Sequence, residues 1–362
     1  MHILLIDDIF PINTRNSKIL SSLASHYKDG VKLSVITWNR NNADTTGFDN
    51  YYFYEKVSAY GKKLRKLVNL WGYRRFCHST IKMLSPDVVI ASHWNNLLLV
   101  PRLCRQKQML IYENLDVPTG PEPIRKVVAR LEKMKMKDAN LTIHASRFFC
   151  SLYDSSLPQI VLENKPTFEA VPSEYKMHTP IRVAFIGLIR HLDILKNLIS
   201  AIRSDTRFCL YLHGDGHACQ QLTEFAKGEP NICFTGRYTY ADINKLYEQS
   251  DVIWAAYPNK DFNVRYAISN KFHESLIFGI PTIYSINTEV GNYASSNSIG
   301  MQVDPYSVES IKEILADIAS GTIDLSNLHT NMLKFQESQT TWNEDFMQVI
   351  RAIDCFSKTV SE

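Results

Sequence analysis

The stretch DVIWAAYPNKDFNVRYAISNKFHESLIFGIPTIYS, residues 251–285, indicates a strand, a loop, a helix and a second strand. Val252–Tyr257 is an apolar run of strand length, and the polar loop Pro258–Asp261 ends it. A short amphipathic helix then stops at Gly279, a typical helix-terminating residue, before the strand Thr282–Tyr284. The alternation predicts an α/β fold, with parallel strands joined by helices.

Lys271 and Glu274 lie one turn apart at the start of that helix. In such a unit a ligand binds outside the carboxyl ends of the strands, where unpaired N–H groups at the helix N-terminus favour an anion. A carboxylate accepts hydrogen bonds from two ribose hydroxyls, while a cation meets a diphosphate. The spacing leaves two interpretations open, a sugar-nucleotide site and a surface ion pair.

Length and composition predict a globular protein of two domains. The chain has 362 residues, of which 45% are hydrophobic and 21% are charged, and a single core usually stops growing below that length. No apolar run reaches 18 residues and the N-terminus enters a strand directly, so we expect a cytoplasmic protein. Seven cysteines without a CxxC pair predict free thiols rather than a zinc site.

Charge is divided unevenly along the chain. Residues 1–165 carry 24 Lys and Arg against 14 Asp and Glu, a net +10, whereas residues 166–362 carry 16 against 23, a net −7. We therefore expect the first half to face nucleic acid, a phospholipid surface or a pyrophosphate-bearing substrate. Residues 56–83 mix cations with aromatic residues, which is typical of a helix on an anionic bilayer or of a solvated face over a core stripe.

The first half begins with a strand that ends at Asp7 and Asp8, followed by a predicted loop over residues 11–18 and a helix over Ile19–Tyr27. A GxGxxG fingerprint is absent, which argues against a dehydrogenase. His93 and Asp116 follow two later strands, Val88–Ala91 and Met109–Tyr112. Carboxyl ends of parallel strands share one edge of a sheet, so we expect His93 and Asp116 to act together.

The alternation of strand and helix patterns along the chain, and its interruption before residue 181, predict four segments. Residues 1–168 form a first domain, residues 169–180 a linker, residues 181–336 a second domain, and residues 337–362 a terminal helix that packs back on the first domain.

Five segments of the second half resemble, in order and spacing, the donor domain of GT-B glycosyltransferases, particularly family 4. They are VAFIGLIR (183–190), LYLHGDG (210–216), ICFTGRYTYADINKLYEQSDVIWAAY (232–257), SNKFHESLIFGIPTI (269–283) and IGMQVDP (299–305). The first half is similar to the more variable acceptor domain through PDVVIASH (86–93), the strand before Asp116 and IVLENKP (160–166). The resemblance implies two doubly wound, Rossmann-like domains that face a central cleft holding a nucleotide-sugar.

Carried over by position, Glu274 matches the glutamate that holds the ribose, and Arg190 matches a cation that meets the diphosphate. Lys196 is a second such cation or helix surface. The remaining candidates are Gly214, Gly236, Arg237 and Lys271 for donor binding, and Asn13, Thr14, Arg15 and Asn95 for acceptor binding. Tyr266 replaces a second family glutamate, Ser269 replaces the Pro of a Pro-x-Lys-x-x-Glu pattern, and Leu115 replaces a histidine, which leaves the donor sugar and the stereochemistry open.

The resemblance implies a metal-independent hexosyltransferase without a cofactor. It would move a sugar from a UDP- or GDP-linked donor to a lipid-linked or oligosaccharide acceptor of a bacterial capsule, O-antigen or exopolysaccharide, at the inner face of the membrane. Asp116 or His93 is the candidate general base if transfer inverts configuration, and with retention the leaving phosphate takes the proton. The alternatives are a nucleotide-sugar epimerase of the same fold and a non-catalytic nucleic-acid or membrane-binding module. No RNP or helix-turn-helix pattern supports nucleic acid as a partner.

Overall fold

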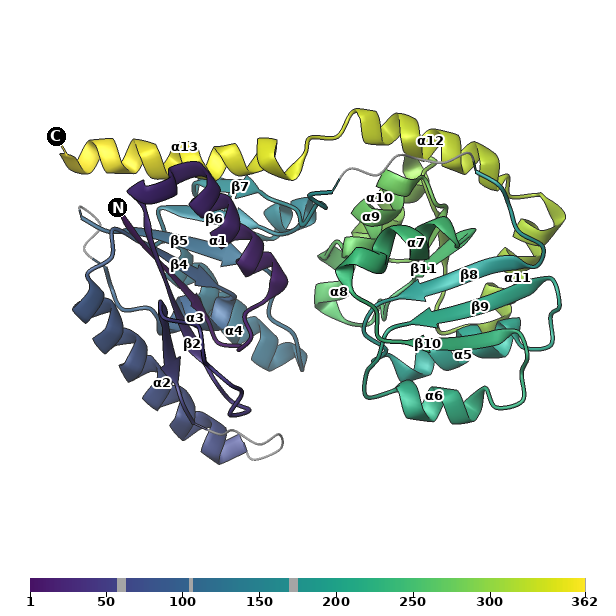
Figure 1. The fold of residues 1–362 in the computed structure, drawn as a ribbon, viewed down its shortest axis with the longest axis horizontal. Coiled ribbons are helices and arrows are strands. Elements are labelled where there is room, and N and C mark those ends of the chain that lie inside the picture. Colours follow the sequence, from purple (N-terminus) through teal and green to yellow (C-terminus); the bar gives the residue numbers. More distant parts are fainter. Residues whose placement is uncertain (57–62, 104–106, 169–174, 362) are drawn as a thin grey trace. The chain divides into compact units, whose positions relative to one another are not determined.

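The chain folds into two α/β units (Figure 1). The computed structural model describes residues 1–56, 63–103, 107–168 and 175–361. Unit 1 consists of Met1–Asn164 together with Trp342–Glu362, and unit 2 is Lys165–Thr341. Each unit has a parallel sheet with helices on both faces. The predicted pair of doubly wound, Rossmann-like domains is therefore confirmed.

The sheet of unit 1 has the strand order β3-β2-β1-β4-β5-β6-β7, and its neighbouring strands pair in parallel. The strands are β1 (His2–Asp7), β2 (Lys32–Trp38), β3 (Tyr51–Tyr54), β4 (Val88–Ser92), β5 (Met109–Asn114), β6 (Leu141–His144) and β7 (Gln159–Val161). The helices are α1 (Thr14–Tyr27), η1 (Lys28–Gly30), α2 (Lys63–Leu84), α3 (Trp94–Leu99), α4 (Glu122–Met136), η2 (Arg147–Leu152) and α13 (Trp342–Ser361).

Alternate residues of each central strand build two separate cores in unit 1, because successive side chains of a strand point to opposite faces. Ile3 and Leu5 of β1 pack on the side of α1 and α13, whereas Leu4 and Ile6 pack on the side of α2, α3 and α4. Figure 1 shows these two helical layers on either side of the sheet. The terminal helix α13 therefore belongs to the fold of unit 1.

The sheet of unit 2 has the order β10-β9-β8-β11-β12-β13, again with parallel neighbours. The strands are β8 (Ile181–Ile186), β9 (Phe208–His213), β10 (Ile232–Gly236), β11 (Val252–Ala255), β12 (Thr282–Ser285) and β13 (Met301–Val303). The helices are α5 (Leu192–Ile202), α6 (Cys219–Phe225), η3 (Tyr240–Asp242), α7 (Ile243–Glu248), α8 (Phe262–Tyr266), α9 (Asn270–Phe278), α10 (Glu289–Ser296), α11 (Val308–Ser320) and α12 (Leu325–Glu337).

The stretch 251–285 folds as predicted, with one addition. β11 and β12 pair in parallel and α9 joins them, ending at Gly279 in the left-handed conformation with φ 66°. Gly279 adopts this conformation without the strain that a Cβ would bring, which explains the helix stop. The short helix α8 directly follows the predicted loop Pro258–Asp261, and Asp261 caps it by accepting a hydrogen bond from the Asn263 N–H, 2.8 Å away.

The described boundaries differ from the predicted ones in two places. Unit 2 begins at Lys165 and unit 1 resumes at Trp342, rather than at residues 181 and 337. Residues 169–174 of the predicted linker lie outside the described residues, but the part that follows is bonded to unit 2. Tyr175 donates to the Asp251 carbonyl at 3.0 Å, and the His178 ring lies 2.8 Å from the Asp251 carboxylate.

Helix α2 contains most of the basic aromatic stretch 56–83. Residues 57–62 lie outside the described part of the chain. In the remainder of the helix, Tyr73, Cys77 and Ile81 are buried in the core, whereas Trp71 is exposed. In this part of α2, the apolar residues at helical spacing therefore pack in the core. Among the described residues no helix combines the length and apolarity needed to cross a bilayer.

Candidate active site

The carboxyl ends of β8 and β11 form the topological switch point of unit 2. The chain runs outward from β8 through β9 to β10 and then returns to the other side of β8 with β11. Loops leaving these two strands diverge, so they open a crevice in which α/β proteins bind ligands. The segment that follows β8 and the helix α9 both lie at this edge of the sheet.

Lys271 and Glu274 form a buried ion pair at this edge. Their Nζ and Oε2 atoms are 2.7 Å apart, and only 9% and 6% of the two side chains are exposed. The Tyr247 hydroxyl donates a second hydrogen bond to the same Oε2, at 2.8 Å. The surface ion pair that the spacing left open is therefore excluded. A desolvated pair of this kind persists because each charge is hydrogen-bonded.

Burial and the Glu274 carboxylate raise the pKa of several nearby tyrosines. Burial, and then the negative charge of Glu274, raise the pKa of Tyr247 well above its usual range and the pKa of Tyr238 to about 12. The same two causes raise the pKa of Tyr257, whose hydroxyl is hydrogen-bonded by Ser269. These phenols stay protonated near neutral pH, so the Tyr247 hydroxyl remains a hydrogen-bond donor to Glu274.

Glycines bring the loops after β8 and β9 into backbone contact. A Cβ on Gly214, whose φ is 133°, would lie 1.9 Å from the Gly187 carbonyl oxygen. A Cβ on Gly216 would lie 2.3 Å from the carbonyl oxygen of Ile189. Gly236 completes this arrangement, because its carbonyl accepts a hydrogen bond from the Gly214 N–H at 2.8 Å. The two glycines of HGDG (213–216) are therefore required for packing, since a side chain at either position would separate the two loops.

A cavity of about 320 Å³ opens over these loops. It is lined by Gly187, Leu188, Gly214, Asp215, Gly216, Arg237 and Tyr238. Lys271 lies close by, because its Cε is 3.9 Å from the position of a Cβ on Gly187. The glycine loops and the Lys271–Glu274 pair thus meet at the end of β8, and backbone groups, a carboxylate and cations come together there.

The predicted cations differ in their surroundings. Arg190 is exposed and donates from Nε to His191 Nε2 at 3.1 Å, while Arg237 pairs with Asp215 at 2.9 Å on the cavity rim. Burial and the Arg190 charge lower the pKa of His191 to about 4, so its ring is neutral and accepts that hydrogen bond. Lys196 lies over the Phe225 ring, 5.4 Å from its centroid, which favours the helix-surface alternative for this residue.

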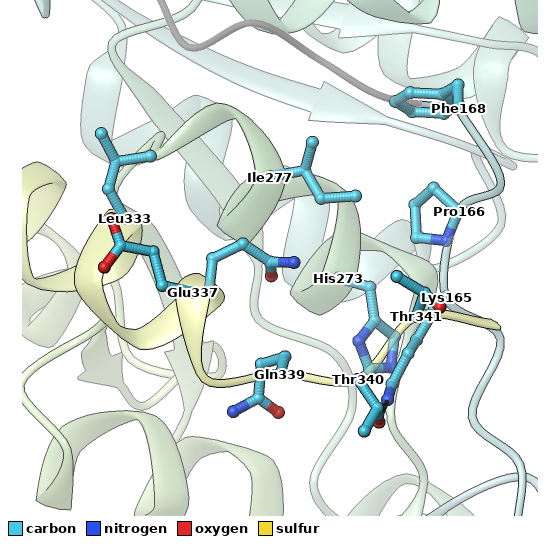
Figure 2. A pocket seen from close by; sticks show the side chains of 11 residues that line it. Lys165, Pro166, Phe168, His273, Ile277, Leu333, Glu337, Gln339, Thr340 and Thr341 are labelled. Atoms are coloured by element: carbon cyan, nitrogen blue, oxygen red, sulfur yellow. Dashed lines mark hydrogen bonds between the residues drawn. The ribbon is translucent and has the colours of Figure 1, made fainter. Parts of the chain in front are cut away.

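A second cavity, of about 350 Å³, lies beside α9 (Figure 2). His273 and Ile277 from α9, Lys165 and Thr340 contribute to its wall. Lys165 donates to the Thr340 hydroxyl at 2.6 Å. The cavity is slightly larger than the one over the glycine loops, but neither Lys271 nor Glu274 is among the residues that line it. We therefore assign the candidate donor site by its chemistry rather than by cavity size.

His93 and Asp116 lie together at the carboxyl edge of the sheet in unit 1, as the strand ends predicted. His93 Nδ1 is 4.0 Å from Asp116 Oδ2, a contact too long for a hydrogen bond but within ion-pair range. His93 adopts a positive φ of 71°, which is uncommon for a residue with a Cβ. The electrostatic surroundings of the Asp7 carboxyl include His93, so this carboxyl belongs to the same cluster.

Asp7 and Asp8 hold neighbouring chain segments. Burial raises the pKa of Asp7, although its carboxylate accepts hydrogen bonds from the Asn13 N–H at 3.0 Å and the Asn16 amide at 2.7 Å. Asp8 forms an ion pair with Arg40. The acidic doublet thus fixes the start of α1 and the loop after β2.

The predicted acceptor loop is instead the first turn of α1. Asn13 is its N-cap and accepts a hydrogen bond from the Arg15 N–H at 2.9 Å, and Thr14 is exposed. Arg15 is buried, with its Nε 2.7 Å from Glu113 and its Nη2 2.6 Å from the Leu162 carbonyl. The prediction of Arg15 as an open acceptor-binding cation is therefore not supported by its surroundings. Asn95 is half-buried in the first turn of α3.

Sequence reasoning missed Tyr247, His191 and Tyr257 as members of the donor cluster. Tyr247 is 27 residues before Glu274, and its helix shows no pattern that sets it apart from other core tyrosines. His191 directly follows Arg190, so a search for polar residues after the first strand of the domain would have found it. Among the described residues, no group of three or more His, Cys, Asp or Glu side chains is arranged to hold a metal ion.

Known proteins resemble this chain in sequence and in fold. Residues 180–320 match the family described as glycosyl transferases, group 1. The succinoglycan biosynthesis protein ExoL of Rhizobium meliloti (strain 1021) is 25% identical over 258 residues, which span 64% of this chain and 64% of that protein. The resemblance found from the sequence motifs is therefore confirmed over the second half of the chain.

Two solved structures share the fold over nearly the whole chain. Sucrose-phosphate synthase from Thermosynechococcus elongatus superimposes with a TM-score of 0.73 at 12% identity, covering 97% of this chain and 98% of its own. HepE of Anabaena in complex with UDP has a TM-score of 0.69 at 15% identity, covering 98% and 100%. At these identities the likeness concerns the fold, and it agrees with the predicted GT-B architecture.

Proposed function

We propose that the protein transfers a sugar from a nucleotide-sugar to an acceptor. The match of residues 180–320 to the group 1 glycosyl transferases and the GT-B fold of the chain support this proposal. The observation that carries the proposal is Glu274, a carboxylate held at the switch point by Lys271 and Tyr247. Both hydrogen bonds from the described residues reach Oε2. Oε1 is therefore available to accept hydrogen bonds from a ribose.

The diphosphate of the donor would lie against the loops after β8 and β9. Gly187, Gly214 and Gly216 let the backbone approach closely there, and Arg190 and Arg237 supply exposed cations at the same edge. Negative charge on the nucleoside diphosphate grows as its bond to the anomeric carbon breaks. Cations and N–H groups aimed at this charge lower the barrier. Arg190, Lys271 and the N-terminus of α9 would have this role, so the proposal requires no metal.

The acceptor hydroxyl loses its proton as its oxygen bonds to the anomeric carbon. We place this hydroxyl at the carboxyl edge of unit 1, where the Asp116 carboxylate lies 4.0 Å from the His93 ring. His93 or Asp116 takes the proton if configuration inverts. If configuration is retained, the leaving phosphate takes the proton, and the two side chains position the acceptor.

For the substrates, we propose a UDP- or GDP-linked hexose and a lipid-linked or oligosaccharide acceptor of a bacterial surface polysaccharide. The similarity to a succinoglycan biosynthesis protein supports an exopolysaccharide, and the complex of HepE with UDP supports a uridine nucleotide. We place the reaction on the cytoplasmic side, at the membrane surface where a lipid-linked acceptor would be present.

The test measures the rate at which nucleoside diphosphate is released when the enzyme is given acceptor and each of a panel of nucleotide-sugar donors. The wild type is compared with Glu274→Gln, Arg190→Gln and the surface control Glu309→Gln. Gln at position 274 keeps the shape of the side chain and an oxygen that accepts a hydrogen bond from Lys271, whereas Ala would leave the buried ammonium group without this acceptor and would destabilise the fold more. We expect kcat/KM to fall about a hundredfold or more in the two site variants, because hydrogen bonds to charged groups are lost. The control should match the wild type.

Two further measurements decide between alternatives. Activity should persist in EDTA, and loss of activity there would contradict the metal-independent scheme. Conversion of the donor sugar in the absence of acceptor would instead identify a nucleotide-sugar epimerase. Wild-type rates in both site variants, with donor turnover intact, would remove the assignment of Glu274 and Arg190.

A further inference from the structure

Helix α4 carries a row of large apolar side chains that face solvent. Ile124, Val127, Leu131 and Met134 are spaced three, four and three residues apart, so they form one line along the helix. Each is 47–61% exposed. Single exposed apolar residues are ordinary, but a continuous row of four on one helix indicates an interaction surface.

A row of cations runs beside the apolar one. Lys126, Arg130, Lys133 and Lys137 are spaced four, three and four residues apart, and all four are exposed. The acidic residues of α4 are Glu122 and Glu132. Glu122 pairs with Lys126 at 2.7 Å and Glu132 is buried, so the outer surface of the helix is apolar along one line and positively charged along the next.

The inner face of α4 is fixed to the sheet, so the apolar row is not a displaced part of the core. The Glu132 carboxylate accepts hydrogen bonds from Tyr112 at 2.5 Å and from Tyr153 at 2.8 Å. Met136 is buried in the core between the sheet and the helices α2 and α3. With these residues turned inward, Ile124, Val127, Leu131 and Met134 must point away from the unit.

We propose that α4 docks the protein on an anionic phospholipid bilayer, with the apolar row at the acyl boundary and the cations on the lipid phosphates. An amphipathic helix with this distribution lies in the plane of the interface. The net charge of unit 1 supports an anionic surface as the partner, because the unit carries 25 Lys and Arg against 18 Asp and Glu. A second copy bound through the same face would bring the two basic rows together, which like-charge repulsion disfavours.

The position of α4 connects this surface to the candidate acceptor site. α4 follows β5 and begins six residues after Asp116, at the carboxyl edge of the sheet. Docking would therefore bring the edge that holds His93 and Asp116 close to lipid headgroups. This last step rests on the proposed function, with its lipid-linked acceptor, whereas the docking surface itself does not.

Flotation of the full chain with vesicles tests the proposal. Vesicles of phosphatidylglycerol and phosphatidylcholine are compared with phosphatidylcholine alone. One variant replaces the cations (Lys126→Glu, Arg130→Glu, Lys133→Glu) and another the apolar row (Val127→Ser, Leu131→Ser, Met134→Ser). The control reverses three exposed lysines of unit 2 (Lys227→Glu, Lys245→Glu, Lys312→Glu), so its net charge changes equally.

We expect the wild type to prefer the anionic vesicles, and each α4 variant to lower the partition coefficient by about tenfold or more, with the control within about twofold. Added salt should weaken wild-type binding. Equal binding by the α4 variants, or no preference of the wild type for anionic vesicles, overturns the proposal. A dimer in sedimentation velocity that the apolar variant abolishes, without vesicle binding, would identify a copy of the chain as the occupant and overturn it too.

Donor binding separates this proposal from the proposed function. The rise in unfolding temperature that nucleotide-sugars cause should be the same in the wild type and in the α4 variants. The altered residues lie in unit 1, whereas the residues around Glu274 lie in unit 2. A protein that floats with anionic vesicles but neither binds nor turns over any nucleotide-sugar would remove the proposed function and leave the docking surface in place.

Discussion

Gly214 occupies a position at which a side chain meets both a steric and a conformational barrier. Its φ of 133° is a region that residues with a Cβ rarely adopt, and a Cβ would lie 1.9 Å from the Gly187 carbonyl oxygen. The obstacle is backbone rather than a flexible side chain, so relief requires the loops after β8 and β9 to separate. Those loops line the candidate donor site.

We predict that Gly214→Ala lowers the unfolding free energy of unit 2 by about 2–4 kcal/mol and weakens nucleotide-sugar binding. The matched control is Gly228→Ala, which also has a positive φ, of 87°, but has no atom within 4 Å of the added Cβ. This control should lower the unfolding free energy by only about 1 kcal/mol. Urea unfolding measures the difference, and equal losses in the two variants would mean that the contact with Gly187 is unimportant.

Glu132 is a buried carboxyl whose protonation is linked to stability. Burial raises its pKa to about 7 despite the hydrogen bonds from Tyr112 and Tyr153. The usual value is about 4.5. Between these two pH values the folded chain binds more protons at this site than the unfolded chain. The unfolding free energy therefore falls as the pH rises from about 4.5 to about 7, and this contribution is constant above that range.

Glu132→Gln should remove this pH dependence, because the amide does not titrate. We expect the wild type to lose on the order of 3 kcal/mol more than the variant between pH 4.5 and pH 8. Urea unfolding of unit 1 at these two pH values, monitored through hydrogen exchange of α4 and β5, measures the difference. Parallel pH profiles for the two proteins would contradict a raised pKa of Glu132.

At the scale of elements, α13 shows how a distant segment completes a core. Trp342, Phe346, Val349 and Ile353 of this helix are buried against strands and a helix from the first 164 residues. The Trp342 ring is held on several sides. Its Nε1 donates to the Ser22 hydroxyl at 3.0 Å, and Lys18 Nζ lies 3.8 Å from the ring centroid.

Trp342→Ala should therefore destabilise unit 1 by about 3–5 kcal/mol, as expected when a large buried aromatic side chain is removed. Val360→Ala, near the exposed end of the same helix, should change stability by less than about 0.5 kcal/mol. Thermal unfolding followed by circular dichroism compares the two variants. A small effect of Trp342→Ala would show that α13 contributes little to the stability of unit 1.

Helix α1 begins five residues before its predicted start at Ile19. Asn, Thr and Ser near residue 14 are typical of turns, so local propensity favoured a loop there. The competing contacts are tertiary. Asn16 donates to Asp7 and to Ser92, and Arg15 reaches Glu113, 98 residues further along the chain. These buried hydrogen bonds outweigh the weak local preference for a loop, and no local sequence pattern predicts them.

At the scale of the whole molecule, the two units have separate cores and separate candidate sites. The donor cluster around Glu274 lies entirely in unit 2, and the His93–Asp116 pair lies entirely in unit 1. A ligand that binds only the folded form of one unit stabilises that unit by mass action.

We predict that UDP or a UDP-sugar raises the unfolding temperature of unit 2 specifically. At a hundred times the dissociation constant the stabilisation is about 2.7 kcal/mol. Hydrogen exchange with resolution at the level of peptides distinguishes β8, β9 and α9 from the strands of unit 1. Glu274→Gln should reduce the effect. Protection that appears first in unit 1 would place the nucleotide elsewhere.

From the sequence alone one could derive two α/β units, the strands on either side of α9 and the importance of Lys271 and Glu274, because period, turn residues and motif spacing are local properties of the chain. Whether Lys271 and Glu274 form a surface pair or a buried one was decided only by the packing of Tyr247 and the glycine loops around them. The same holds for Arg15, which its spacing placed in an open loop and which Glu113 buries. Burial depends on which distant elements cover a residue, and that information arises only when the sheet and its helices assemble.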